Sequence, residues 1–460
     1  MGWAEEEFET LDLGDTRLNR RAVLLAERLS QKPGASIPGA CGSWSETVAA
    51  YRFLDNEEVN WDDVMAAHWQ ASHQRIAQHG VVLCIQDTTE LDYNGKQMEG
   101  LGPLSYEAQR GMYLHPTYVV TPEREPLGVI NAWMWAREFK DGDDQPRGGP
   151  VESRRWIESY EIIAEQARKL PDTRHIFVGD RESDMLALMV RAKELNHAAD
   201  YLVRCQHNRV LPKVDGLGGK LWDGVMQSEC IGGLIFELPP GRGRKPRMVR
   251  QEIRMQRVSL SDGKRTKKGR ESQEDQDKGQ IEVTCLIASE IDTPAGCEPV
   301  VWRLLTNREA TTLEQACELI DWYRARWEIE MFFSVLKVGL QVEKLQLGDT
   351  RKLQTALALY MIIAWRINRL MRLGRTLPDL PADLLFEADE WRAAFILNKK
   401  PPPKTVPTAN TVIRLIAKLG GFLGRKGDGE PGAKTLWQGM RDLAVFVQGM
   451  RYARELELAG

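Results

Sequence analysis

The stretch WYRARWEIEMFFSVLK, residues 322–337, has the pattern of an amphipathic helix with an unusual polar side. On an α-helix each residue turns by about 100°, which puts Tyr323, Arg326, Glu330 and Lys337 within an arc of about 60°. Over about four turns these side chains form a stripe about 21 Å long. The apolar residues of the stretch occupy a neighbouring arc, so we expect the stripe to border the hydrophobic core.

Two interpretations of this stripe are open. In the first it is a solvated helix face, in which Arg326 and Glu330 form an i,i+4 ion pair worth roughly 0.3–0.5 kcal/mol. In the second, Tyr323, Arg326 and Lys337 bind phosphate oxygens by hydrogen bond and charge, and Glu330 is a metal ligand. The rest of the chain favours the second interpretation.

Two aspartates close short apolar segments elsewhere in the chain. Asp87 ends VVLCIQD and Asp180 ends HIFVGD, and both segments have the pattern of buried strands. Carboxylates at strand ends can converge with one from a helix, here Glu330. Mg²⁺ prefers oxygen ligands, and two such ions about 3.5–4 Å apart activate water and stabilise the leaving oxygen of a phosphodiester. We therefore expect a metal-dependent phosphodiester site.

The 460 residues, 42% of them hydrophobic, suffice for several hydrophobic cores. We expect short helices over 1–70, then three strands, then helices alternating with strands up to about residue 206. Strand-like pieces with loops rich in Gly, Lys and Arg occupy 207–300, one more strand follows, and 311–372 are helical. A proline-rich linker at 398–411 precedes a small helical tail.

Charge is distributed unevenly along the chain. The formal net charge is −4, yet residues 241–270 hold 12 Lys or Arg against two acids, a local charge of +10. Such a segment is typical either of a surface that contacts a nucleic-acid backbone or of a flexible solvated loop.

Other features argue against several classes of protein. Seven scattered cysteines without a CxxC pair suit reduced thiols in a cytosolic protein and speak against a structural zinc site. The acidic start, MGWAEEEFET, lacks the apolar core of a signal peptide. The longest apolar stretch, ALALYMIIAW at 356–365, is about half of what a membrane span needs. We expect a soluble intracellular protein.

The motifs together resemble the cut-and-paste transposases of the insertion-sequence-four family, and within it the Tn-five type most closely. The resemblance is carried by Asp87 in QDTTELDY, by Asp180 in GDRESD, and by the Y-x2-R-x3-E-x6-K pattern from Tyr323 to Lys337. Further matching motifs run along the chain: GDTRLNRR, AYRFLDN, YLVRCQHNR, VVWRLLTN, IDWYRARWEIE and AKLGGF.

The resemblance implies an α/β fold: an RNase H-like (retroviral integrase-like) mixed sheet flanked by helices, with a β-rich insertion and helical terminal domains. The catalytic domain would comprise 71–206 and 301–372, interrupted by the insertion at 207–300. Residues 1–70 would form the DNA-binding domain that recognises transposon ends, and 373–460 the dimerisation region.

The resemblance also implies roles for single residues. Asp87, Asp180 and Glu330 match the catalytic triad that binds two Mg²⁺ ions, with Mn²⁺ as a substitute. Trp302 matches a position where an indole stacks on a base that leaves the duplex during hairpin formation. Contacts to DNA are implied for Arg17, Arg20, Arg21, Arg204, His207, Arg209, Trp302, Tyr323, Arg326 and Lys337.

Some of these residues have a structural alternative. Trp302 could be a core tryptophan of a strand, and the three N-terminal arginines could lie on a solvated helix face. Glu182 and Asp184, in DRESD, either support the metal ligands or stabilise the first turn of a helix through its dipole.

The implied function is that of a DNA transposase. A homodimer would bind two transposon ends in a synaptic complex, hydrolyse the 3′ strand, form and resolve a hairpin, and transfer the 3′ ends into target DNA. The expected partners are double-stranded DNA and a second copy of the chain, with no membrane, in the bacterial cytoplasm at the nucleoid. The alternatives are an inactive or domesticated relative that binds DNA or inhibits, and a hydrolase with paired carboxylates such as a glycosidase, which would need no basic stripe.

Overall fold

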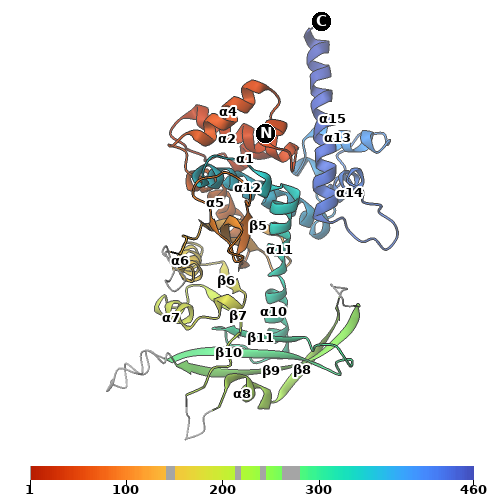
Figure 1. The fold of residues 1–460 in the computed structure, drawn as a ribbon. Helices are drawn as coiled ribbons and strands as arrows, with labels where there is room; N and C mark the ends of the chain where they lie inside the picture. Colours follow the sequence, from red (N-terminus) through yellow and green to blue (C-terminus); the bar gives the residue numbers. More distant parts are fainter. Residues whose placement is uncertain (1, 141–150, 213–218, 239–244, 262–279, 460) are drawn as a thin grey trace. The chain divides into compact units, whose positions relative to one another are not determined.

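The structure, a computed structural model, describes residues 2–140, 151–212, 219–238, 245–261 and 280–459 (Figure 1). The chain forms two compact units. Unit 1 comprises Met1–Gln78, Thr88–Pro150 and Trp327–Gly460. Unit 2 comprises His79–Asp87 and Val151–Arg326.

Unit 1 begins with a run of helices, as the sequence predicts. They are α1 (Trp3–Glu7), α2 (Thr16–Gln31), α3 (Ile37–Ala40), α4 (Trp44–Asp55) and α5 (Trp61–Ile76). Asp15 is the N-cap of α2, and its side chain accepts a hydrogen bond from the backbone N–H of Arg17. Ala22, Leu25 and Leu29 are buried on one side of this helix.

The strands of unit 1 pair around β4 (Arg110–Val120). Its antiparallel neighbours are β2 (Thr89–Asp92), β3 (Gly102–Pro103) and β5 (Pro126–Trp135). Both β4 and β5 are buried along nearly their whole length, which suits their continuous runs of apolar residues. Strands β4 and β5 are two of the three strands that the sequence predicts after the N-terminal helices.

Helix α12 (Thr350–Thr376) packs against α5 and β5 in the core of unit 1. The apolar stretch at 356–365 lies within α12 and is buried, so its hydrophobicity belongs to the core. No helix in the described part of the chain is long and apolar enough to span a membrane. The other elements from residue 327 onward are α11 (Trp327–Ser334), the π-helical turn η2 (Val335–Gly339), η3 (Val342–Lys344), η4 (Ala382–Leu384), α13 (Ala388–Leu397), α14 (Ala409–Leu419) and α15 (Ala433–Ala459).

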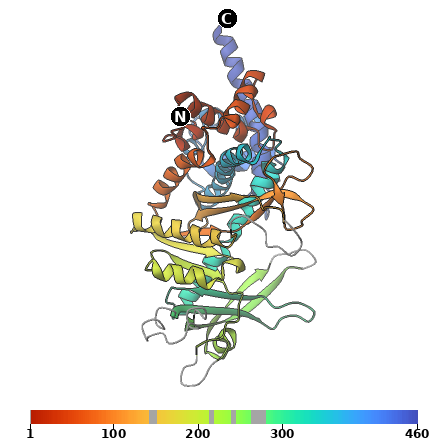
Figure 2. The same ribbon diagram turned by 60° about the vertical axis from the view of Figure 1, so that its left-hand side comes forward.

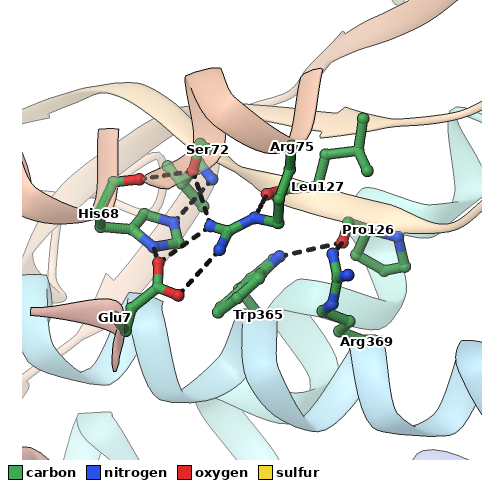
Figure 3. Close-up of polar contacts among 9 residues, drawn as sticks. Glu7, His68, Ser72, Arg75, Pro126, Leu127, Trp365 and Arg369 are labelled. Atoms are coloured by element: carbon green, nitrogen blue, oxygen red, sulfur yellow. Dashed lines mark hydrogen bonds and ion pairs between the residues drawn. The ribbon is translucent and has the colours of Figure 1, made fainter. Parts of the chain in front are cut away.

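A buried polar network ties α1 to the core of unit 1 (Figure 3). Glu7, the last residue of α1, accepts hydrogen bonds from His68 Nδ1 (2.5 Å) and from Nη1 and Nη2 of Arg75 (2.9 Å each), both on α5. His68 Nε2 accepts the backbone N–H of Val129 in β5 (3.0 Å), so the imidazole is neutral and carries its proton on Nδ1. The Arg75 guanidinium also lies 4.2 Å from the ring centroid of Trp365 on α12.

Unit 2 contains a mixed sheet with the strand order β1-β6-β7-β11-β10-β9-β8. The first three strands are parallel and every later pair is antiparallel. Their bounds are β1 (Val81–Gln86), β6 (Arg174–Gly179), β7 (Asp200–Arg204), β8 (Cys230–Leu238), β9 (Arg247–Ser261), β10 (Gln280–Ile291) and β11 (Val301–Thr306). The helices of this unit are α6 (Arg154–Lys169), η1 (Arg181–Ser183), α7 (Leu186–Glu194), α8 (Leu221–Gln227) and α10 (Leu313–Arg324). Helices α6 and α7 lie side by side near β6 (Figure 2).

Strands β8 to β10 belong to the segment 207–300 that the sequence marks as a β-rich insertion. They form a long antiparallel ribbon that continues the sheet beyond β11 (Figure 1). Of the basic segment 241–270, only 245–261 lies within the described residues, and it forms β9. The mixed sheet with packed helices confirms the α/β class, while the four domain boundaries stay a prediction.

Candidate active site

The parallel strands of unit 2 bring two predicted site residues into one row. Ile85 pairs with Val178 in β1 and β6, and Val178 pairs with Leu202 in β7. Two residues further along each strand, the same register aligns Asp87, Asp180 and Arg204 at the carboxyl edge. Neighbouring strands are about 4.7–4.9 Å apart, and residues in register share a face of the sheet. The expectation that Asp87 and Asp180 each close a short strand is therefore confirmed, and the structure adds that the two strands are neighbours.

Asp87 is held by a cation from another part of unit 2. The Nη1 of Arg326 donates a hydrogen bond to Asp87 Oδ2. The side chains of the pair are 14% (Arg326) and 18% (Asp87) exposed, so it lies at the rim and not in the core. Arg326 lies two residues after the end of α10, and its backbone N–H donates to the carbonyl of Tyr323 (3.1 Å). The turn after α10 thus positions the guanidinium of Arg326 beside Asp87, at the carboxyl end of β1.

Tyr323 lies near Asp180 and near two arginines, Arg204 and Arg326, all of which affect its pKa. Burial raises the pKa of the Tyr323 phenol; the positive charges of Arg326 and Arg204 oppose this, and nearby Asp180 adds to it. Hydrogen bonding from Arg204 also lowers the pKa of the phenol. The hydroxyl therefore stays protonated at neutral pH and can donate a hydrogen bond to an anion.

Asp180 begins a tight turn that orients its carboxylate. Its Oδ1 accepts the backbone N–H of Glu182 (2.9 Å), and its carbonyl accepts the hydroxyl of Ser183 (2.7 Å). Glu182 is itself bound by Arg155, a buried residue of α6 that sequence reasoning missed. An arginine in the first turn of an amphipathic helix looks like a solvated residue, so the sequence held no signal for it.

The prediction of one continuous α-helix over residues 322–337 is wrong. Helix α10 ends at Arg324. The N–H of Ala325 is then shared between the carbonyls of Asp321 and Trp322, and the N–H of Arg326 donates to Tyr323, only three residues back. Helix α11 then begins at Trp327, and a π-helical turn covers Val335–Gly339. A tightened turn and a widened one change the rotation per residue, so the even spacing of about 100° does not hold along the stretch.

The stripe is also divided between the two units. Tyr323 and Arg326 belong to unit 2, together with Asp87 and Asp180, whereas Glu330 and Lys337 belong to unit 1. Within the described residues, no group of three or more His, Cys, Asp or Glu side chains is arranged to hold a metal ion. Unit 2 by itself supplies two carboxylates and three polar or cationic side chains at one sheet edge.

In unit 1, Lys337 connects its π-helical turn to β2 and η3. Its Nζ donates to the carbonyl of Glu90 (2.8 Å) and lies 3.2 Å from Glu343 Oε1. The Lys337 side chain is 30% exposed. Glu330, on α11, is partly exposed as well. The predicted role of Lys337 in phosphate binding stays a prediction.

The other predicted DNA contacts fall into two groups. Trp302 on β11 is partly exposed and stacks on Phe236 of β8, with ring centroids 5.3 Å apart and 16° between planes. Arg17 on α2 is 87% exposed beside Asp15, Arg20 is exposed and Arg21 is partly exposed. These residues can reach a ligand.

Of two further predicted contacts, Arg209 has a charged partner inside the protein, whereas His207 is exposed and only its backbone is bound. Arg209 forms an ion pair with the buried Asp184, and the backbone N–H of His207 donates to the same carboxylate. Asp184 therefore does not act mainly through a helix dipole, which was one of its two expected roles.

Two protein-family models match the two ends of the chain. A family model described as transposase DNA-binding matches residues 1–59, and one described as transposase Tn5 dimerisation domain matches residues 362–460. The cryo-EM structure of a piggyBac transposase synaptic complex with hairpin DNA is similar at 9% identity and a TM-score of 0.36, covering 94% of this chain and 75% of that one. That TM-score is too low to establish a shared fold. The two family models, which match the two ends of one chain in this order, support a Tn5-like transposase.

Proposed function

We propose that this protein cleaves the ends of a DNA transposon by metal-dependent phosphodiester hydrolysis and transfers the 3′ ends into target DNA. The observation that carries the proposal is the alignment of Asp87 and Asp180 at the carboxyl edge of adjacent parallel strands, with Arg204, Tyr323 and Arg326 around them. The terminal DNA-binding and dimerisation domains supply the setting in which such a site would act on DNA.

The donor set fits Mg²⁺. Asp87 and Asp180 offer hard carboxylate oxygens from adjacent strands, and the N–H of Glu182 orients one of them. We propose that Glu330 completes the triad and that two Mg²⁺ ions, or Mn²⁺ in their place, bind these residues. Such ions would activate a water and stabilise the charge that develops on the phosphodiester.

The neighbouring side chains would bind and orient the DNA backbone. Arg326 presents a planar guanidinium at the rim, and it can exchange the carboxylate of Asp87 for phosphate oxygens of similar geometry. Tyr323 keeps its proton at neutral pH, so it would donate a hydrogen bond to phosphate instead of acting as a base. Arg204 would hold the phenol in place and add positive charge.

The finer steps belong to the same proposal. An RNase H-like arrangement would account for parallel strands that end in the two aspartates, with α7 connecting β6 to β7. Hairpin formation would use Trp302, whose indole already makes a stack with Phe236 and is partly exposed. Dimerisation through the C-terminal domain would pair two transposon ends in one synaptic complex.

The test uses duplex DNA that carries the inverted repeats flanking the gene. Asp87→Asn, Asp180→Asn and Glu330→Gln should each abolish Mg²⁺-dependent cleavage and leave binding of the ends within about twofold in a gel-shift assay. Asp172→Asn, at an exposed position between α6 and β6, is the matched control and should cleave like the wild type. Cleavage that persists in any of the three variants would contradict the assignment of that residue. A wild type that binds the ends but never cleaves them would favour the inactive relative.

A further inference from the structure

The buried carboxylate of Asp184 binds the loop that follows β7. We call its contacts with Gln206, His207 and Arg209 the clasp. Asp184 is 2% exposed, and its Oδ2 accepts the backbone N–H groups of Gln206 (2.7 Å) and His207 (3.0 Å). The same oxygen accepts Nη1 of Arg209 (3.0 Å), while Nη2 of Arg209 lies 2.7 Å from Oδ1 and donates to the backbone carbonyl of Asp184 (2.9 Å). A buried charge is stable only when it is paired and hydrogen-bonded. Here Oδ2 accepts three hydrogen bonds, while Oδ1 has only the ion-pair contact with Arg209.

Asp184 belongs to the turn that orients Asp180. Within GDRESD the backbone N–H of Asp184 donates to the carbonyl of Arg181 (3.2 Å). Two further bonds, from the N–H of Glu182 and the hydroxyl of Ser183, close the turn on Asp180. A single hydrogen-bonded turn thus begins with Asp180, a predicted metal ligand, and ends with Asp184, which forms the clasp.

The clasped loop carries Arg204 at its start. Arg204 is the last residue of β7, one position beyond the pair Gly179–Val203, and its charge and hydrogen bonding lower the pKa of Tyr323. Cys205 and the clasped amides follow immediately, so the position of Asp184 fixes where the chain leaves the sheet. Both terminal nitrogens of Arg209 bind Asp184, and the Arg209 side chain is only 12% exposed. The positive charge of Arg209 is therefore paired inside the protein.

We propose that Asp184 is a positioning residue of the candidate active site. By clasping the backbone at 206–207 and the guanidinium of Arg209, it holds Arg204 beside Tyr323 and Asp180. Arg209 is a partner in this clasp and not a contact to DNA. The proposal rests on the proposed function for its consequence in catalysis, but the clasp itself is independent of that function.

The first test measures single-turnover cleavage of transposon ends by the full chain. Asp184→Asn keeps the shape of the side chain and an acceptor for the two amides, but loses the charge that pairs with Arg209. We expect cleavage to slow by about 10–100-fold, the range for partners that orient active-site ligands, with end affinity changed by less than about threefold. Asp172→Asn is the control. Unchanged cleavage would overturn the proposal.

A double-mutant cycle separates positioning from general stability. If Asp184 acts through Arg204, the variant that combines Asp184→Asn with Arg204→Gln should cleave no more slowly than Arg204→Gln alone. A merely structural role would give multiplied losses, and that result counts against the proposal. Should Asp184→Asn fail to fold, Arg209→Lys takes its place, because it keeps the charge but loses the two-pronged contact.

Amide hydrogen exchange gives a readout that needs no cleavage. In Asp184→Asn the amides of 206–207 should exchange faster, while those within β6 and β7 stay protected. If the wild type proves unable to cleave DNA, the proposed function fails, yet this exchange pattern still tests the clasp. Equal exchange in the wild type and the variant would overturn it.

Discussion

Unit 1 and unit 2 each contain an acid bound to an arginine, and the two pairs differ in how they are enclosed. Glu7 in unit 1 is 6% exposed and accepts hydrogen bonds from His68 and Arg75 (Figure 3). Asp87 in unit 2 is three times as exposed, at 18%, and shares its sheet edge with a second carboxylate, Asp180.

The difference shows how the surroundings decide what an acid–arginine pair does. Glu7 is surrounded by protein donors, so its carboxylate is fully used in holding α1 to α5. Two carboxylates on adjacent strands repel each other unless cations lie near them, and such an arrangement costs stability that a ligand can restore. The first pair is structural, and the second is suited to binding.

The largest expected effect is on stability, from Glu7→Ala. The variant leaves the buried His68 without the acceptor of its Nδ1–H and the partly buried Arg75 without its carboxylate, and breaking a buried pair in this way costs about 3–5 kcal/mol. Urea unfolding followed by tryptophan fluorescence measures the loss. Glu9→Ala, two residues away and exposed, should change the free energy of unfolding by no more than about 0.5 kcal/mol. Equal losses in the two variants would mean that the network does not hold the fold.

The next effect is the dependence of stability on pH. Burial by itself raises the pKa of Glu7, but the hydrogen bonds from His68 and Arg75 and the positive charge of Arg75 outweigh it and lower the pKa from 4.5 to about 2. The stabilisation is therefore complete above about pH 4.5 and is lost as the pH falls towards 2; its full size is about 3 kcal/mol. Burial also lowers the pKa of His68 from 6.5, so the unfolded chain gains a proton first and stability begins to fall below that pH.

Unfolding measured at several pH values tests this dependence. In Glu7→Gln the fall between pH 4.5 and 2 should become shallower than in the wild type. A variant that keeps the wild-type slope would show that another acid causes it.

A smaller effect separates the second pair from the first. Mg²⁺ at ten to a hundred times its dissociation constant should stabilise the wild type by about 1.4–2.7 kcal/mol, because it binds only the folded chain. Asp180→Asn should lose this gain, whereas Glu7→Gln, although less stable, should retain it. Calorimetric melting with and without Mg²⁺ gives both values. A gain that survives in Asp180→Asn would place the ion elsewhere.

The smallest effect concerns Lys337. Lys337→Met keeps the aliphatic stem but removes the ammonium, so binding of transposon ends should weaken by about 1 kcal/mol and the salt dependence of binding should fall by about one phosphate contact. Lys344→Met, at an exposed position nearby, is the control. Affinity and salt dependence equal to those of the wild type would leave Lys337 with only its bonds to Glu90 and Glu343.

Sequence reasoning found the strands and their closing aspartates because both signals are local. Short apolar runs such as VVLCIQD and HIFVGD predict buried strands, and an acid after each marks an edge. The same reasoning failed at the junction of α10 and α11, because a tightened turn followed by a π-helical turn leaves the pattern of residue types nearly helical. It gave no warning of the network around Glu7, whose partners lie 61 and 68 residues away.

The sequence alone therefore determined the element types, the acids that end β1 and β6, and the resemblance of its motifs to a transposase family. Local propensity and the order of residues carry that information. Only the tertiary structure decided that Asp87, Asp180 and Arg204 share one register, that Asp184 faces the loop after β7, and that Glu7 is enclosed by donors. Those facts depend on pairing between segments far apart in the chain, where burial and hydrogen bonding select one partner among many with similar residues.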